Sequence, residues 1–133
     1  MAKEAIGSNA IFSGPQKGLT VIGKHAYAYS GLTNAPAAPG GTALEFTTGP
    51  YLVDSKLTVG SANAYTNDVT MELMFNDQIV YAQIFTNTSQ EYITGVNPYE
   101  FIIPPLTKVT LTFENTSGGG TSNWYAILKG NIE

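Results

Sequence analysis

Apolar and polar residues alternate with a period of two along several short segments of the chain, most clearly over residues 51–59. Successive side chains of a β-strand point to opposite faces, so this pattern predicts a strand with one buried and one exposed face. The side chains expected in the core are Tyr51, Val53, Leu57 and Val59, and those expected in solvent are Asp54, Lys56 and Thr58.

Further strands are expected from the same alternation before and after this segment. Residues 69–75 and 78–85 flank the pair Asn76-Asp77, and both residues of that pair tolerate left-handed backbone, so a tight hairpin is predicted. The segment Tyr99 to Ile103 ends at Pro104-Pro105, which cannot donate to a strand ladder. The remaining predicted strands are residues 19–22, 25–29, 109–113 and 124–132.

The last of these segments, Trp124 to Ile132, is more apolar than an exposed edge strand. We therefore expect it inside the fold or beneath a partner. The stretch from Thr33 to Gly41 is rich in proline and small residues, as expected of a surface loop. No segment shows helical periodicity.

The first 18 residues have no strand pattern, and Pro15 interrupts regular pairing. Two interpretations are open: a disordered leader, or an extended arm whose isolated apolar residues Ile6, Ile11 and Phe12 dock on a neighbouring subunit. The expected organisation is an N-terminal arm over 1–18 and one domain over 19–133. Its predicted class is all-β, an antiparallel two-sheet sandwich, with a jelly roll favoured over an immunoglobulin-like arrangement.

Composition narrows the function classes. Charged residues make up only 12% of the 133 residues, the net charge is -4, and there is no arginine and no cysteine. An acidic chain without arginine is a poor candidate for binding nucleic acid or anionic membranes. Without cysteine, disulfides, thiolate nucleophiles and the common structural zinc sites are excluded. No signal peptide or apolar membrane-spanning segment is visible.

Candidate catalytic groups are few, and we expect no enzyme activity and no cofactor. His25 is the only histidine, and it is predicted to share a strand face with Tyr27 and Tyr29. The carboxylates that might pair for glycoside hydrolysis, Glu72 with Glu100 or Asp54, are expected mainly on solvated faces. Acidic residues that might bind calcium are scattered without a loop motif, and no metal site is predicted; they are Asp54, Asp68, Asp77 and Glu91.

Aromatic residues are the enriched class that suits a binding function, with eight tyrosines, six phenylalanines and one tryptophan. Tyr92, Tyr99, Trp124 and Tyr125 lie near predicted loops or strand ends, where rings can stack on sugars or anchor in a partner. Core packing is the favoured alternative for Trp124. With the apolar residues of the arm, these four form the predicted assembly or binding surface.

Three passages in the second half of the chain resemble small jelly-roll proteins that viruses and tailed phages use as capsid components or capsid decorations. They are Leu73-Met74-Phe75-Asn76-Asp77-Gln78-Ile79-Val80-Tyr81, the run from Tyr99 through Pro104-Pro105 to Thr112, and Asn123-Trp124-Tyr125-Ala126-Ile127-Leu128-Lys129-Gly130. The resemblance implies a non-catalytic virion protein assembled in a host cytoplasm. Its partners would be copies of itself, in a trimer or larger symmetric unit, and other capsid proteins.

Two function hypotheses follow. The first is a structural virion protein that self-assembles through its sandwich and its N-terminal arm. The second is a carbohydrate-binding module, adhesin or receptor-binding domain that binds a glycan through loop aromatics.

Overall fold

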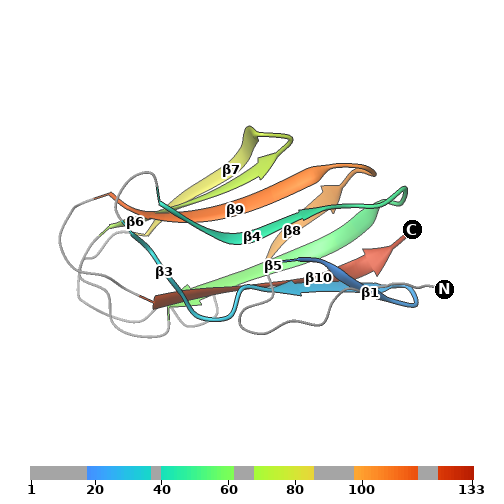
Figure 1. The fold of residues 1–133 in the computed structure, drawn as a ribbon, viewed down its shortest axis with the longest axis horizontal. Coiled ribbons are helices and arrows are strands. Elements are labelled where there is room, and N and C mark those ends of the chain that lie inside the picture. The colour runs from blue at the N-terminus through green and yellow to red at the C-terminus, as the bar shows by residue number, and fades with distance from the viewer. Residues whose placement is uncertain (1–17, 37–39, 62–67, 86–97, 117–122) are drawn as a thin grey trace.

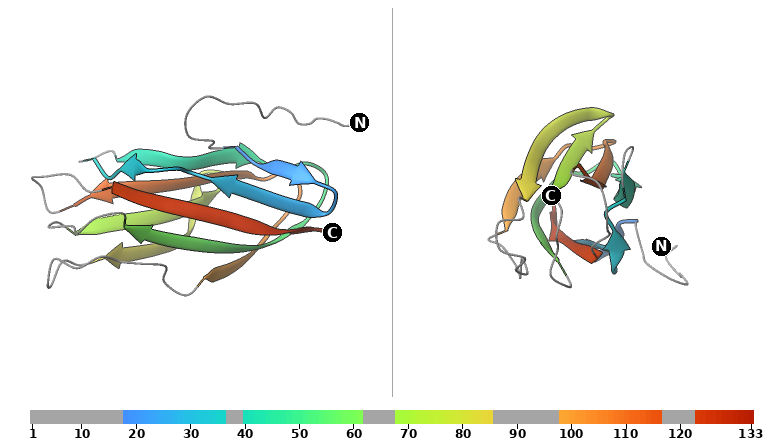
Figure 2. Two further views of the ribbon diagram at one scale, coloured as in Figure 1. Left: turned by 90° about the horizontal axis from the view of Figure 1, so that it is seen from below. Right: turned by 90° about the vertical axis from the view of Figure 1, so that its left-hand side faces the viewer.

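The protein is a sandwich of two antiparallel β-sheets packed face to face (Figure 1; Figure 2). The computed structural model describes residues 18–36, 40–61, 68–85, 98–116 and 123–133. These residues contain ten strands and no helix: β1 (Thr20–Ile22), β2 (His25–Tyr29), β3 (Thr33–Asn34), β4 (Gly41–Thr47), β5 (Val53–Ser61), β6 (Val69–Phe75), β7 (Gln78–Phe85), β8 (Tyr99–Ile103), β9 (Lys108–Asn115) and β10 (Asn123–Ile132). The predicted all-β two-sheet class is confirmed.

Strand order identifies the kind of sandwich. One sheet has the order β1-β2-β10-β5-β8, with β3 also paired to β10, and the other has the order β4-β9-β6-β7. In the sequence, β6 and β7 are neighbours and form a hairpin. The strands on either side of this hairpin, β5 and β8, pair with each other, as do β4 and β9 and then β2 and β10. All four pairings are antiparallel. An eight-stranded ribbon folded in this nested way is a jelly roll, whereas an immunoglobulin sandwich divides its strands into ABED and CFG sheets. The preference for a jelly roll is therefore confirmed.

The strands predicted from alternation lie close to their expected positions. Val53, Leu57 and Val59 of β5 are fully buried while Asp54 and Lys56 are exposed. The turn between β6 and β7 contains Asn76 and Asp77 at φ values of 54° and 67°. Two consecutive left-handed residues match the twist of a hairpin, which is why this pair connects the two strands directly.

Two strands were not predicted, and both show the limits of the alternation signal. β4 contains a β-bulge between Thr42 and Leu44, so that the consecutive residues Ala43 and Leu44 are both buried. A bulge shifts the two-residue period, and the pattern is lost from the sequence. β3 lies within the predicted loop from Thr33 to Gly41, where two residues pair with the start of β10.

The core lies between the sheets and is built from large apolar side chains of both. Trp124 of β10 is fully buried, and its ring centroid lies 4.9 Å from that of Phe85 in β7 and 5.6 Å from that of Phe113 in β9. Trp124 thus joins the two sheets. The final strand is central, between β2 and β5, which explains its apolar sequence without a partner.

Candidate functional site

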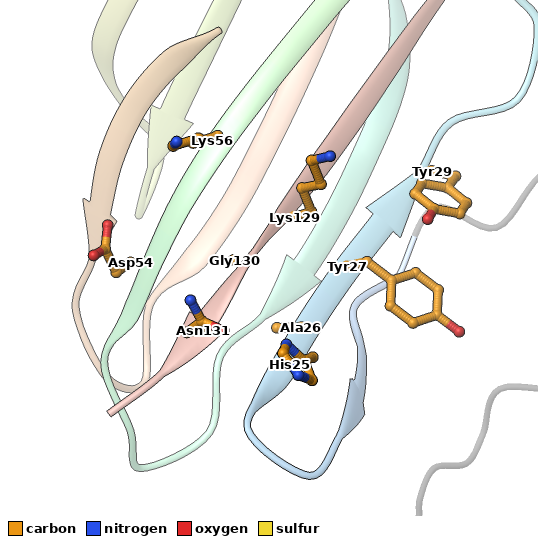
Figure 3. A pocket seen from close by; sticks show the side chains of 9 residues that line it. All are labelled: His25, Ala26, Tyr27, Tyr29, Asp54, Lys56, Lys129, Gly130 and Asn131. Atoms are coloured by element: carbon orange, nitrogen blue, oxygen red, sulfur yellow. The ribbon is translucent and has the colours of Figure 1, made fainter.

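A shallow hollow of about 630 Å³ lies on β2, β5 and β10, at the end of the six-stranded sheet where β2 begins and β10 ends (Figure 3). Strand register places its side chains in two rows. His25 of β2 is opposite Asn131 of β10, which in turn is opposite Asp54 of β5. Two residues along each strand, the second row runs from Tyr27 through Lys129 to Lys56.

The aromatic wall of the hollow comes from β2. Tyr27 and Tyr29 are two residues apart, so they point to the same face, and their ring centroids are 5.0 Å apart with a 34° angle between the planes. Tyr29 is 46% exposed. The expectation that His25 shares this face with both tyrosines is confirmed.

The charges of the hollow come from β5 and β10. Lys129 is directly opposite Lys56, and Lys56 is opposite Glu100 on the neighbouring edge strand β8. Like charges directly opposite each other across a strand pair repel, while Glu100 and the nearby Asp54 offset this charge. The hollow is therefore polar and mixed in charge rather than strongly basic or acidic.

Gly130 brings the backbones of β5 and β10 close together in the floor of the hollow. A Cβ atom at this position would meet the carbonyl oxygen of Asp54 and would lie 2.7 Å from the Cα of Ser55. Because both neighbours are backbone atoms, they cannot move aside as a flexible side chain would. A larger residue here would therefore push the two strands apart.

A second surface lies at the side of the sandwich where β7 and β8 form the edges of the two sheets. Tyr81 of β7 lies between the sheets against Tyr99 and Phe101 of β8, with ring centroids 4.9 Å and 5.9 Å apart. Burial raises the pKa of Tyr99 above its usual value of 10.0, and the charge and hydroxyl of the neighbouring Tyr81 raise this pKa further. The hydroxyl of Tyr81 donates a hydrogen bond to Gln83 Oε1 at 3.0 Å.

The solvent side of β7 is apolar. Ile79, Val80 and Ile84 are 57%, 47% and 57% exposed, and Ala82 between them is also exposed. We call this strand, from Gln78 to Phe85, the β7 edge. It contains no charged residue and no proline.

The structure distributes the predicted binding aromatics over different environments. Tyr125 points outward from β10 and is half-buried, Tyr99 packs on Tyr81 between the sheets, and Trp124 is a core residue rather than part of a surface. Ile6, Ile11, Phe12 and Tyr92 lie outside the described residues. Of the predicted aromatics that the structure describes, Tyr99, Trp124 and Tyr125, none lines the hollow.

The candidate catalytic carboxylates divide between the two sheets. Glu72 lies on β6, whereas Asp54 and Glu100 lie on β5 and β8 of the opposite sheet. Packed sheets are about 10 Å apart, and outward side chains of the two sheets point in opposite directions, so Glu72 does not converge with the other two. Within the described ranges, no group of three His, Cys, Asp or Glu side chains is placed to hold a metal ion.

Sequence reasoning did not select the residues that line the hollow as a site. The spacing of His25, Tyr27 and Tyr29 indicated a shared face, and that was the available signal. Their proximity to Lys129 and Asn131 depends on the pairing of β2 with β10, about 100 residues later in the chain. No local pattern specifies such a pairing.

Comparison with protein-family models and with curated protein sequences found no match. The fold therefore defines the class to which the chain can be assigned, a jelly-roll β-sandwich. In the parts of the chain that the structure describes, there is no helix long and apolar enough to cross a membrane.

Proposed function

We propose that this protein is a non-catalytic structural protein that acts by assembling with copies of itself. The observation that carries the proposal is the β7 edge, an eight-residue edge strand without charge or proline that exposes Ile79, Val80 and Ile84. Natural proteins protect long edge strands with charges, prolines or covering segments, because an open edge is a template for pairing with another chain. No described strand covers this apolar edge, and that favours a protein–protein contact.

The proposed setting is a virus or phage particle assembled in a host cytoplasm, as a capsid component or capsid decoration with other capsid proteins as partners. This setting rests on the resemblance of three passages to small jelly-roll virion proteins. The passages correspond to the β6-β7 hairpin, to β8 and the start of β9 with Pro104-Pro105 between them, and to β10. A jelly-roll topology is compatible with the setting, although fold alone does not specify function.

Light scattering coupled to size-exclusion chromatography tests the proposal. We expect the full chain, of 14.2 kDa, to elute at a multiple of that mass at micromolar concentration. A mass that stays at one chain up to about 100 µM, where even weak associations of roughly −5 kcal/mol are populated, would reject self-assembly.

The hollow supports a second candidate function, binding of a glycan. Tyr27 and Tyr29 offer adjacent ring faces, and Asn131, His25 and Lys129 offer hydrogen-bonding groups beside them. A pocket with aromatic walls and a few polar groups is the usual form of a small-molecule site. Of the aromatics predicted to bind a glycan, Tyr99, Trp124 and Tyr125 do not line the hollow, so Tyr27 and Tyr29 take their place in this hypothesis.

A glycan array followed by titration of the best ligand would test this second function. We expect Tyr27→Ala to abolish detectable binding, because the ring provides the stacking surface. Tyr125→Ala is the matched control, since Tyr125 points outward from β10 but does not line the hollow. Equal loss in both variants, or no binding by the wild-type protein, would count against the glycan site.

A further inference from the structure

The four sheet edges formed by the described strands differ in how well they are protected against pairing. β1 has only three residues, and β8 has five, carries the exposed Glu100 and is followed by Pro104-Pro105. β4 carries the exposed Glu45 and a bulge. Short length, charge, proline and bulges are the devices that keep edges from pairing, so three of the four edges are protected.

The β7 edge is the exception among them. Its bulge opposite Leu73 and Met74 lies next to the hairpin, and from Tyr81 to Phe85 the strand pairs regularly with β6. Among the described strands, β7 pairs with β6 alone. Alternate backbone N–H and C=O groups on its other side are therefore oriented to accept an additional strand.

The side chains of β7 favour a second copy of the same strand as that partner. Register with β6 shows that Ala82 and Ile84 point outward, whereas Tyr81 and Gln83 are on the core side. If two copies pair antiparallel about a two-fold axis at Ala82, this small residue faces itself. Val80 of one copy then faces Ile84 of the other, so exposed apolar residues cover each other.

Charge does not oppose this pairing. β7 has no charged residue, and Glu72 of the neighbouring strand β6 is opposite Ala82. In the paired sheet, the two copies of Glu72 would be separated by three strand spacings, about 14 Å at the usual strand separation. Repulsion between charges that far apart is largely screened at physiological ionic strength.

We propose that two copies of this protein associate by antiparallel pairing of their β7 edges around Ala82, which joins two four-stranded sheets into one eight-stranded sheet. The inference rests on the proposed self-assembly and specifies its contact. A two-fold contact of this kind gives a dimer by itself. It gives a larger assembly when a second surface contributes.

A charge substitution with a matched control tests this contact. Ala82→Glu places two like charges directly opposite each other on the two-fold axis, and we expect the dissociation constant measured by light scattering to rise at least tenfold. Thr112→Glu is the control. Thr112 of β9 is also opposite Glu72, but it lies on the side of β6 that faces away from β7. Both variants place a new glutamate beside Glu72, but only Ala82→Glu places it at the proposed contact.

A cross-linking experiment tests the register. The chain has no cysteine, so Ala82→Cys introduces a single thiol. Facing residues of an antiparallel pair have Cα atoms about 4.5–5.5 Å apart, which lies within the range that a disulfide spans. We expect mild oxidation to convert Ala82→Cys into a covalent dimer, whereas Thr112→Cys stays largely uncross-linked.

The outcomes separate the contact from the broader function. Loss of assembly in Ala82→Glu alone, with cross-linking of Ala82→Cys alone, supports pairing through β7. If the wild-type protein assembles but the two glutamate variants behave alike, or Ala82→Cys does not cross-link, the β7 contact is wrong and self-assembly stands. A wild-type protein that remains monomeric, with no cross-linking of Ala82→Cys, overturns both.

Discussion

At the scale of single residues, polar groups inside this sandwich have specific partners. The buried Ser30 accepts a hydrogen bond from the backbone N–H of Ala126 at 2.8 Å, and the buried Thr48 accepts one from the N–H of Thr107 at 2.9 Å. A buried polar group without a partner costs free energy, so these bonds allow short polar side chains to occupy core positions. Ser55 interrupts the apolar face of β5. Its hydroxyl is also satisfied, because it donates a hydrogen bond to the carbonyl oxygen of Phe101 at 3.0 Å.

Tyr99 should make the stability of the protein depend on pH in the alkaline range. Its pKa is raised in the folded state, mainly by burial and then by Tyr81, so folding favours the neutral phenol. The stabilisation from this residue is complete below the unfolded pKa of 10.0 and is lost as pH rises through the folded pKa. Urea unfolding at intervals between pH 8 and pH 11 measures this loss.

Tyr99→Phe is the comparison, because phenylalanine keeps the ring but cannot ionise. We expect the free energy of unfolding of this variant to fall less steeply above pH 10 than that of the wild-type protein. The two proteins differ only at this hydroxyl, so the difference between the two curves isolates Tyr99. Identical slopes would show that the phenol of Tyr99 does not contribute to the alkaline loss.

At the scale of elements, the β6-β7 hairpin shows how local sequence and tertiary contact combine. Asn76 tolerates left-handed backbone, and its side chain also contacts another strand, with Oδ1 accepting a hydrogen bond from the Lys108 N–H at 3.0 Å. The backbone N–H of Asn76 donates to the carbonyl oxygen of Lys108 at 2.8 Å. The tight hairpin was predicted from the residue pair, but the contact with the start of β9 follows only from the sheet order.

Asn76→Ala should destabilise the protein by about 1.5–3 kcal/mol, since alanine loses the hydrogen bond and adopts left-handed backbone unfavourably. Asn76→Gly keeps the backbone freedom and loses only the hydrogen bond, so we expect a smaller loss of about 1 kcal/mol. Chemical denaturation of both variants measures the two contributions separately. If glycine costs as much as alanine, the backbone conformation is not the reason for asparagine at this position.

At the scale of the whole molecule, the two sheets are joined by a few large side chains. Trp124 from the six-stranded sheet contacts Phe85 and Phe113 from the four-stranded sheet, and it has no exposed surface. We expect Trp124→Ala to cost about 3–5 kcal/mol, a large part of the total stability of a domain of this size. Trp124→Phe retains most of the ring contact and should cost clearly less.

Circular dichroism during urea unfolding is the suitable measurement, because the chain contains one tryptophan and both variants lose its fluorescence. Equal costs for alanine and phenylalanine would mean that ring volume at this position does not hold the sheets together. Far-ultraviolet spectra that match the wild-type protein before denaturation would confirm that both variants keep the β-sandwich.

The sequence by itself determined where most strands lie, which of their faces are buried and where the β6-β7 hairpin turns, because alternation and turn residues act over a few neighbouring positions. It did not predict β4, whose bulge at Ala43 disrupts the period. Only the tertiary structure decided which strands pair and which remain at the edges. The central position of β10, the meeting of Tyr27 with Lys129 and the edge position of β7 among the described strands all follow from pairings between distant segments, which no local pattern specifies.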